Sequence, residues 1–358
     1  MAAVITNLES VAAAQTKIRI HACTEQDCVR WEQFVNTHSE CTNYHRWSWK
    51  HVFERVFGWS AIYLIAEEDG VVRGILPLIH QRCLLRSYLS SMPHLKGGGI
   101  VAESLQAEQA LFHAAVEQAV RIDANYLELR HLTEHDLPVM KREDKVGAML
   151  PVAATTEERL RRLDKKARNL VRKSQTYGMT AGFGGAELLR DFYNVYRRNM
   201  RDLGSPSYSR RFFAEILNCF PDETRICIVR LNGEVVAGGF LLGFRGVLEV
   251  GWASSYRKFL NLKPNMFLYW NILEFAAQHG YEFIDFGRSS RDSGTLDFKM
   301  QWGAVSSDLH WGYWRPAPEP ISNSRSGGMQ LASRVWKRLP LAMTNVLGPA
   351  LVRHIPGI

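Results

Sequence analysis

The feature that most limits how this chain can fold is an internal repeat. Residues 63–79 read YLIAEEDGVVRGILPLI, and residues 226–242 read ICIVRLNGEVVAGGFLL. Each segment places a polar turn that ends in glycine between two β-rich runs, which is the pattern of a β-hairpin. A second pair of segments, 108–130 and 266–288, each gives a helix, a short turn and a strand that ends in arginine. Both pairs are offset by about 160 residues, so we predict two copies of one α/β unit.

The order of elements within each copy predicts the class of fold. Hydrophobic periodicity indicates helices over 25–37, 45–57 and 104–124 in the first copy. In the second copy it indicates one long basic helix over 155–177 and a strand over 281–288. Helices before a hairpin, followed by a helix and a strand, predict an α/β (α+β) unit. Its sheet is expected to be mixed and largely antiparallel, with helices on both faces.

The repeat also predicts how the chain is divided. We expect a leader over residues 1–16, a first unit over 17–150, a second unit over 151–315, and a linker with a basic tail over 316–358. The tail alternates basic and apolar side chains at helical spacing, so two interpretations stay open. It either lies on an anionic membrane surface or docks on the body of the protein.

Composition restricts the location and the partners of the protein. The formal net charge is +8, which favours an anionic partner such as a phosphate, a nucleotide, RNA or an acidic membrane surface. The six cysteines form no C-x-x-C pair, which is typical of free thiols in a reducing compartment. No run approaches the roughly 20 apolar residues of a membrane span. We therefore expect a cytoplasmic protein, with the inner face of the cytoplasmic membrane as a place that the tail would allow.

The basic helix and the strand after the last helix of the repeat hold the first candidate site residues. Arg168 and Arg172 are four positions apart and share a helix face with Lys173 beside them, so they could bind an anion such as tRNA or a nucleotide-sugar diphosphate. The alternative is a solvated face. In the strand, Asp285 and Arg288 are charges among apolar residues. Such charges either form structural ion pairs or lie at the end of the strand, where a substrate anion could bind.

Other candidates surround the same strand. Ser289 would leave the strand together with Arg288, where a substrate anion could bind. Trp252 and Tyr256 are aromatic residues that either line a cleft or pack in the core. Asn199 and Arg201 lie at a predicted helix end before Gly-Ser-Pro, which reads as an acceptor loop or as a capped turn.

The loop before the last helix of the second unit bears on the donor. Residues 256–264 read YRKFLNLKP and contain no glycine, whereas a coenzyme A pyrophosphate loop needs glycines beside a helix N-terminus. Arg257 and Lys263 could still hold a phosphate by charge. The 12 histidines show no paired ligand spacing, so we predict no metal site.

Four segments carry a resemblance to a known family. They are KKARNLVRKSQTYG at 165–178, RNMRDLGSP at 198–206, YEFIDFGRS at 281–289 and FKMQWG at 298–303. In this order they resemble the FemAB peptidyltransferases, close to the BioF2-like acetyltransferase domain. The second segment and the tail from residue 336 look specifically like the FemAB-related proteins associated with PEP-CTERM/exosortase systems of exopolysaccharide-producing bacteria.

The resemblance implies a fold and an activity. Two tandem GNAT-like units would transfer an activated acyl or aminoacyl group to an amine on a cell-envelope or exopolysaccharide-related precursor. The donor would be aminoacyl-tRNA or acyl-CoA, as a co-substrate rather than a bound cofactor. This chain lacks the long helical hairpin that some family members use as a tRNA-handling arm, which leaves the donor open. A CoA-dependent N-acyltransferase and a non-catalytic binding protein are the alternatives.

The resemblance also places Lys299, in the Phe-Lys pair of the fourth segment, beside the reacting centre with Arg288 and Asp285. We expect the segment to be a strand, so that Lys299 faces away from Phe298 and Met300. An ammonium there is suited to stabilise an oxyanion or a donor phosphate. No Ser/His/Asp or Cys/His arrangement is evident, which fits direct attack by the acceptor amine. We expect the first unit, with Arg130 at the position of Arg288, to be mainly structural.

Overall fold

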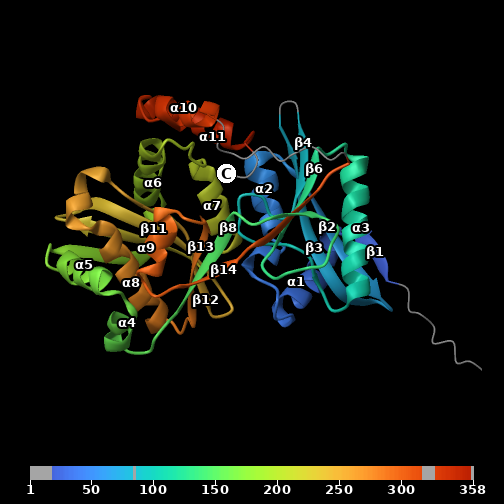
Figure 1. Cartoon of the computed structure of the whole chain (residues 1–358), viewed down its shortest axis with the longest axis horizontal. Helices are drawn as coiled ribbons and strands as arrows, with labels where there is room; N and C mark the ends of the chain where they lie inside the picture. The colour runs from blue at the N-terminus through green and yellow to red at the C-terminus, as the bar shows by residue number, and fades with distance from the viewer. Residues whose placement is uncertain (1–17, 84–85, 317–326, 356–358) are drawn as a thin grey trace, which may run out of the picture.

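The computed structural model describes residues 18–83, 86–316 and 327–355, with side chains described from residue 331 in the last range. The expected leader and most of the expected linker therefore lie outside the described residues. The described chain forms two mixed sheets, each flanked by helices (Figure 1). This is the α/β (α+β) architecture that the repeat predicts.

The two sheets have matching strand orders. The first runs β1 (Arg19–Ala22), β2 (Ser60–Glu68), β3 (Val71–Arg82), β4 (Ser87–Ser90), β6 (Tyr126–His131), β15 (His310–Trp314), β7 (Met140–Arg142), with β5 (Val101–Ala102) beside β3. The second runs β9 (Met179–Gly184), β10 (Thr224–Leu231), β11 (Glu234–Phe244), β12 (Val247–Ser255), β13 (Phe283–Ser290), β8 (Lys145–Pro151), β14 (Val305–Asp308). In each sheet the fourth and fifth strands, β4 with β6 and β12 with β13, run parallel, and the other described pairs are antiparallel.

The two units exchange one strand each, which corrects the expected boundaries at 150 and 315. After β7 the chain leaves the first sheet, and β8 pairs with β13 in the second. After β14 the chain returns, and β15 pairs with β6 in the first sheet. Each exchanged strand lies at or just before an expected boundary. The sequence pattern therefore assigned β8 to the first unit and β15 to the second.

Helices form three layers around the two sheets (Figure 1). The first sheet is covered on its outer face by α3 (Leu105–Arg121), and the second by α8 (Pro264–Gln278) with α5 (Lys165–Gln175) against it. Between the sheets lie α1 (Cys28–Thr37), α2 (Trp49–Phe57), α6 (Leu189–Leu203) and α7 (Arg210–Cys219). One apolar core joins both units there, since Phe53 of α2 and Phe213 of α7 belong to the same buried cluster. Short 3-10 turns are η1 (Glu25–Asp27), η2 (Asn43–His45), η3 (Ala186–Leu188) and η4 (Arg257–Leu262).

Two expected elements of the second unit differ in the structure. The long basic helix over 155–177 is broken into α4 (Thr156–Arg162) and α5, because Asp164 caps a new helix by accepting a hydrogen bond from the Ala167 N–H. The expected strand at 298–303 is wrong. Residues there lie in α9 (Gly294–Met300) and the turn after it, and the rings of Phe298 and Trp302, four positions apart, both contact Tyr269.

The tail docks on the body. It forms α10 (Gly327–Trp336) and α11 (Leu341–Val352), drawn in red at the top of Figure 1. The guanidinium of Arg201 on α6 donates to the Leu339 carbonyl (3.3 Å), and Val352 is buried in the core between the units. The inner side of these helices therefore docks on the body, as one of the two interpretations of the tail expects.

Candidate active site

The two parallel strands in the middle of the second sheet diverge part-way along their length. β12 and β13 pair at Val247/Phe283, Leu248/Ile284 and Glu249/Asp285. Beyond this point β12 continues along β11 to Ser255, and β13 continues along β8 to Ser290. The last paired residues are both acids, so two carboxylates mark the point of divergence.

Residues of the first unit hold both carboxylates. The Lys96 ammonium, from the loop after β4, forms a buried ion pair with Asp285, whose Oδ1 also accepts from the Gly287 N–H (2.8 Å). The Tyr44 hydroxyl donates to Glu249 Oε1 (2.6 Å). The divergence point of the second sheet is therefore also a contact between the units.

The surroundings of Glu249 make its carboxyl harder to ionise. Glu249 is partly exposed as a residue, but its carboxyl is surrounded by protein. Loss of solvent, and next the Asp285 charge, raise the pKa of Glu249 to about 7. A carboxyl with this pKa exchanges a proton near neutral pH, which is the property of a general base.

Lys299 lies directly beside the divergence. It is on α9, its side chain is buried, and its Nζ donates to the carbonyl oxygens of Gly287 (3.1 Å) and Arg288 (2.9 Å). Burial lowers the pKa of Lys299 to about 8, while the Asp285 charge opposes this shift. An ammonium has three N–H groups, so one is not used by the described residues.

Arg288 contacts a second arginine from the first unit. The guanidinium groups of Arg288 and Arg130 both donate to the Leu95 carbonyl, at 3.4 and 2.6 Å. Both also lie over the ring of Trp311. Burial and the Arg130 charge lower the pKa of Arg288 to about 10. Two like charges this close favour an anion near Arg288.

Four residues that the sequence predicted for the site lie close together in the structure. Asp285, Arg288 and Ser289 are on β13, and Lys299 on α9 bonds to the same strand. Ser289 is buried in that strand, and its Oγ has no hydrogen-bond partner among the described residues. The charge of Asp285 is paired with that of Lys96 from the first unit.

Several residues of the site were missed. Lys96, Tyr44 and Trp311 come from the first sheet and its loops, so their contacts with the second unit are long-range. Glu249 carried a usable signal, because it is a charge inside the apolar strand 247–253, the same argument that identified Asp285.

The predicted acceptor residues are near the far end of β12. Asn199 Nδ2 donates to Ser254 Oγ (3.1 Å), so α6 is fixed against this strand. The half-buried Trp252 packs edge-on against Tyr208 and Phe213, and the Tyr256 ring lies under Arg198. Arg201 is directed instead to its neighbour Asp202 and to the tail.

The predicted basic residues lie elsewhere on the second unit. Arg168, Arg172 and Lys173 are on α5, which packs against α8 on the outer face of the sheet. Arg168 donates to the Leu163 carbonyl (3.1 Å), and the other two are exposed. Arg257 and Lys263 precede the N-terminus of α8 on η4 and at the cap position.

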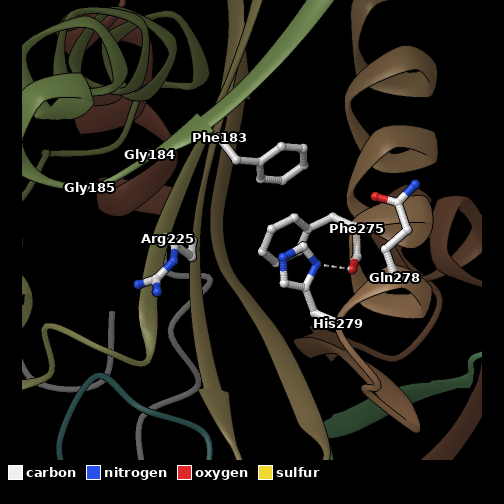
Figure 2. Close-up of a pocket in the computed structure, with 7 residues that line it drawn as sticks. All are labelled: Phe183, Gly184, Gly185, Arg225, Phe275, Gln278 and His279. Carbon is white, nitrogen blue, oxygen red and sulfur yellow. Dashed lines mark hydrogen bonds between the residues drawn. The ribbon is translucent and has the colours of Figure 1, made fainter.

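A separate hollow of about 480 Å³ lies at the other end of α8 (Figure 2). Phe183 and Phe275 stack in it, and His279 Nδ1 bonds to the Phe275 carbonyl (2.9 Å). The Arg225 guanidinium donates to the carbonyls of Pro221 and Thr224. The side chains of Arg225 and His279 thus bond to backbone carbonyls of the protein. The hollow shares no residue with the divergence of β12 and β13. Among the described residues no His, Cys, Asp and Glu group could hold a metal ion.

Comparisons with known proteins agree with this architecture. The sequence profile described as "Acetyltransferase (GNAT) domain" matches residues 157–300. The matched residues all belong to the second unit. No curated protein sequence matches the chain.

Solved structures extend the likeness to both units. The crystal structure of FemX is similar with a TM-score of 0.68 at 16% identity, covering 83% of this chain and 97% of that one. A tandem GNAT protein from the clavulanic acid biosynthesis pathway has a TM-score of 0.54 at 10% identity over 85% and 100%. L-PGS from Bacillus licheniformis has 0.52 at 12% over 78% and 90%. The chain therefore has a tandem GNAT fold, like that of FemX.

Proposed function

We propose that the protein transfers an acyl or aminoacyl group from an activated donor to an amine, at the divergence of β12 and β13. The observation that carries the proposal is the group of charges there. Lys96, Arg288 and Lys299 supply three cations against the two acids Glu249 and Asp285. An excess of buried positive charge is suited to a reaction in which an oxyanion develops.

The chemistry follows from these groups. The acceptor amine attacks the carbonyl carbon of the donor ester or thioester, and a C–N bond forms as the carbonyl oxygen becomes an oxyanion. The third N–H of Lys299 stabilises that oxyanion. The carboxylate of Glu249 accepts the proton from the amine and returns it to the leaving oxygen or sulfur as the tetrahedral intermediate collapses, which releases the donor alcohol or thiol. Asp285 acts as a positioning residue through Lys96.

The remaining predicted residues fit binding roles. Arg288 and Ser289 would contact an anionic part of a substrate. Arg257 and Lys263, before α8, would hold donor phosphates, and the exposed face of α5 with Arg168, Arg172 and Lys173 would contact a longer polyanionic donor. Asn199, Trp252 and Tyr256 would form the acceptor side, and Arg201, through Asp202 and the Leu339 carbonyl, would fix the end of α6 beside them.

Four sequence segments support a FemAB-type enzyme of the group associated with PEP-CTERM/exosortase systems. We therefore propose an amine-bearing cell-envelope or exopolysaccharide-related precursor as acceptor, a cytoplasmic location, and aminoacyl-tRNA as donor. The match to the GNAT acetyltransferase domain favours a second donor, acyl-CoA.

Donor binding and transfer distinguish these possibilities. Purified protein is titrated with acetyl-CoA, longer acyl-CoAs, aminoacyl-tRNA and UDP-sugars while its melting temperature is measured. A stabilising donor is then tested for transfer to amine-bearing precursors. Stabilisation by one donor class, lost in Lys299→Met, supports the proposal. Stabilisation by a glycan precursor alone, with no donor bound, would indicate a non-catalytic binding protein.

A further inference from the structure

The two terminal helices carry an unusual share of exposed apolar side chains. Fifteen large apolar side chains are exposed in the described residues, and six of them lie on α10 and α11: Leu331, Val335, Met343, Val346, Leu347 and Leu351. Their exposed fractions run from 40% to 75%. Single exposed apolar residues are ordinary, but six within 21 consecutive positions form a patch that needs a partner.

These side chains are exposed even though α11 packs closely on the body of the protein. Thr344, Gly348 and Val352 are buried at four-residue spacing, so α11 already has one face against the body. A Cβ on Gly348 would lie 3.1 Å from the Ser207 backbone, which shows how closely that face packs. Met343 and Val346 project from the opposite face. The apolar patch is therefore the outer surface of a docked layer, at the top edge of the molecule in Figure 1.

Charge indicates what covers the patch. After Glu319 the sequence has no Asp or Glu, and it has five Arg or Lys residues: Arg325, Arg334, Lys337, Arg338 and Arg353. Arg334 is exposed on α10 and shares a helix face with Leu331, and Arg338 is exposed in the turn that follows the helix. An apolar surface on a segment whose charged side chains are all cations is complementary to the anionic headgroups and acyl chains of a bilayer surface.

We propose that α10 and α11 form a membrane-binding face that lies in the headgroup region of an anionic bilayer. No described helix is long and apolar enough to cross a membrane, so the contact is peripheral. The face is formed by the tail and not by the residues of the β12/β13 divergence. The proposal therefore goes beyond the transferase activity and is tested without it.

Vesicle flotation tests the proposal on the purified full chain. The protein should float with vesicles of phosphatidylglycerol and phosphatidylethanolamine and about tenfold less with phosphatidylcholine alone, and salt should weaken the binding. Arg334→Gln with Arg338→Gln should reduce binding to the anionic vesicles by about tenfold or more. Each removes a charge from an exposed position, so the melting temperature should not change.

The apolar contribution has a matched control. Val346→Asp on α11 should reduce vesicle binding by about tenfold or more, because it places a charge in the apolar layer. Val120→Asp changes another exposed valine (59%, against 75% for Val346) on α3, away from the tail, and should leave binding unchanged. Failure of the wild-type chain to float with anionic vesicles would overturn the proposal. So would equal losses in both variants, or a concentration-dependent dimer that Val346→Asp abolishes without any vesicle binding.

Discussion

The two units share one architecture, but they differ at the point where the two parallel strands of each sheet separate. In the first sheet β4 and β6 pair in parallel up to Ser90/Glu128, and in the second β12 and β13 pair up to Glu249/Asp285. In the first unit the chain turns back into the divergence. The Ser91 and Gly99 N–H groups donate to the carbonyls of Glu128 (2.8 Å) and Arg130 (3.0 Å).

Packing shows how completely the first divergence is filled. Residues 91–100 are all buried, and a Cβ at Gly99 would lie 2.3 Å from the His131 ring. Glycine is needed here for the close approach of the backbone to this ring. In the second unit β12 continues to Ser255 instead, so the described chain does not turn back in this way.

The acids of the two units differ accordingly. Burial opposes ionisation of Glu128, but the Arg130 charge and the Tyr313 hydroxyl outweigh it and hold the pKa of Glu128 below its usual value. In the second unit burial and Asp285 raise the pKa of Glu249. One copy has its charges satisfied within the fold, and the other keeps groups that can exchange a proton. This is the division of labour expected after a duplication when one copy becomes structural.

The largest effect is expected at Lys299. Lys299→Met keeps most of the stem and removes the charge, so the fold should persist while turnover falls on the order of a hundredfold or more, the scale of losing one oxyanion donor. Steady-state kinetics with the substrate pair measures this. Near-normal turnover in a folded Lys299→Met protein would remove the residue from the site.

Arg130, the counterpart of Arg288, should behave differently. Its side chain is fully buried and pairs with Glu128 (3.0 Å), so Arg130→Ala leaves a buried carboxylate without its cation. We expect a loss of about 3–5 kcal/mol in the free energy of unfolding, and a smaller effect on turnover. Denaturant unfolding and kinetics on the same preparation measure both. Abolished activity at an unchanged melting temperature would show that the first unit belongs to the site.

The smallest effect is expected on the outer face of the second unit. Arg168→Ala with Arg172→Ala should raise the Michaelis constant of the anionic donor several-fold at low salt, and the difference should shrink as ionic strength rises. Kinetics at two salt concentrations measure it, with Arg55→Ala on α2 as a control for a lost exposed charge. An unchanged Michaelis constant for both substrates at low salt would mean that α5 is only a solvated face.

Much of the second unit could be predicted from the sequence, because local patterns determine it. The hairpin of β10 and β11, the glycine-ended helix α6 and the charges Asp285 and Arg288 all follow from patterns within about ten residues. The helix at Lys299 could not be predicted in this way, because six residues are too few to distinguish helical from strand periodicity. Contacts such as Tyr44 with Glu249 link residues 205 positions apart, and no local pattern reports them.

The pH dependence of kcat/KM tests the central claim most directly, that the second divergence is the working site and the first is structural. The wild-type value should rise through about pH 7 as Glu249 loses its proton and fall above about pH 8 as Lys299 loses its own. Glu249→Gln should remove the rise and lower the rate. Glu128→Gln, the same substitution at the buried acid of the first unit's divergence, should lower the melting temperature and keep the rise. A profile whose rise survives in Glu249→Gln and disappears in Glu128→Gln would contradict the account.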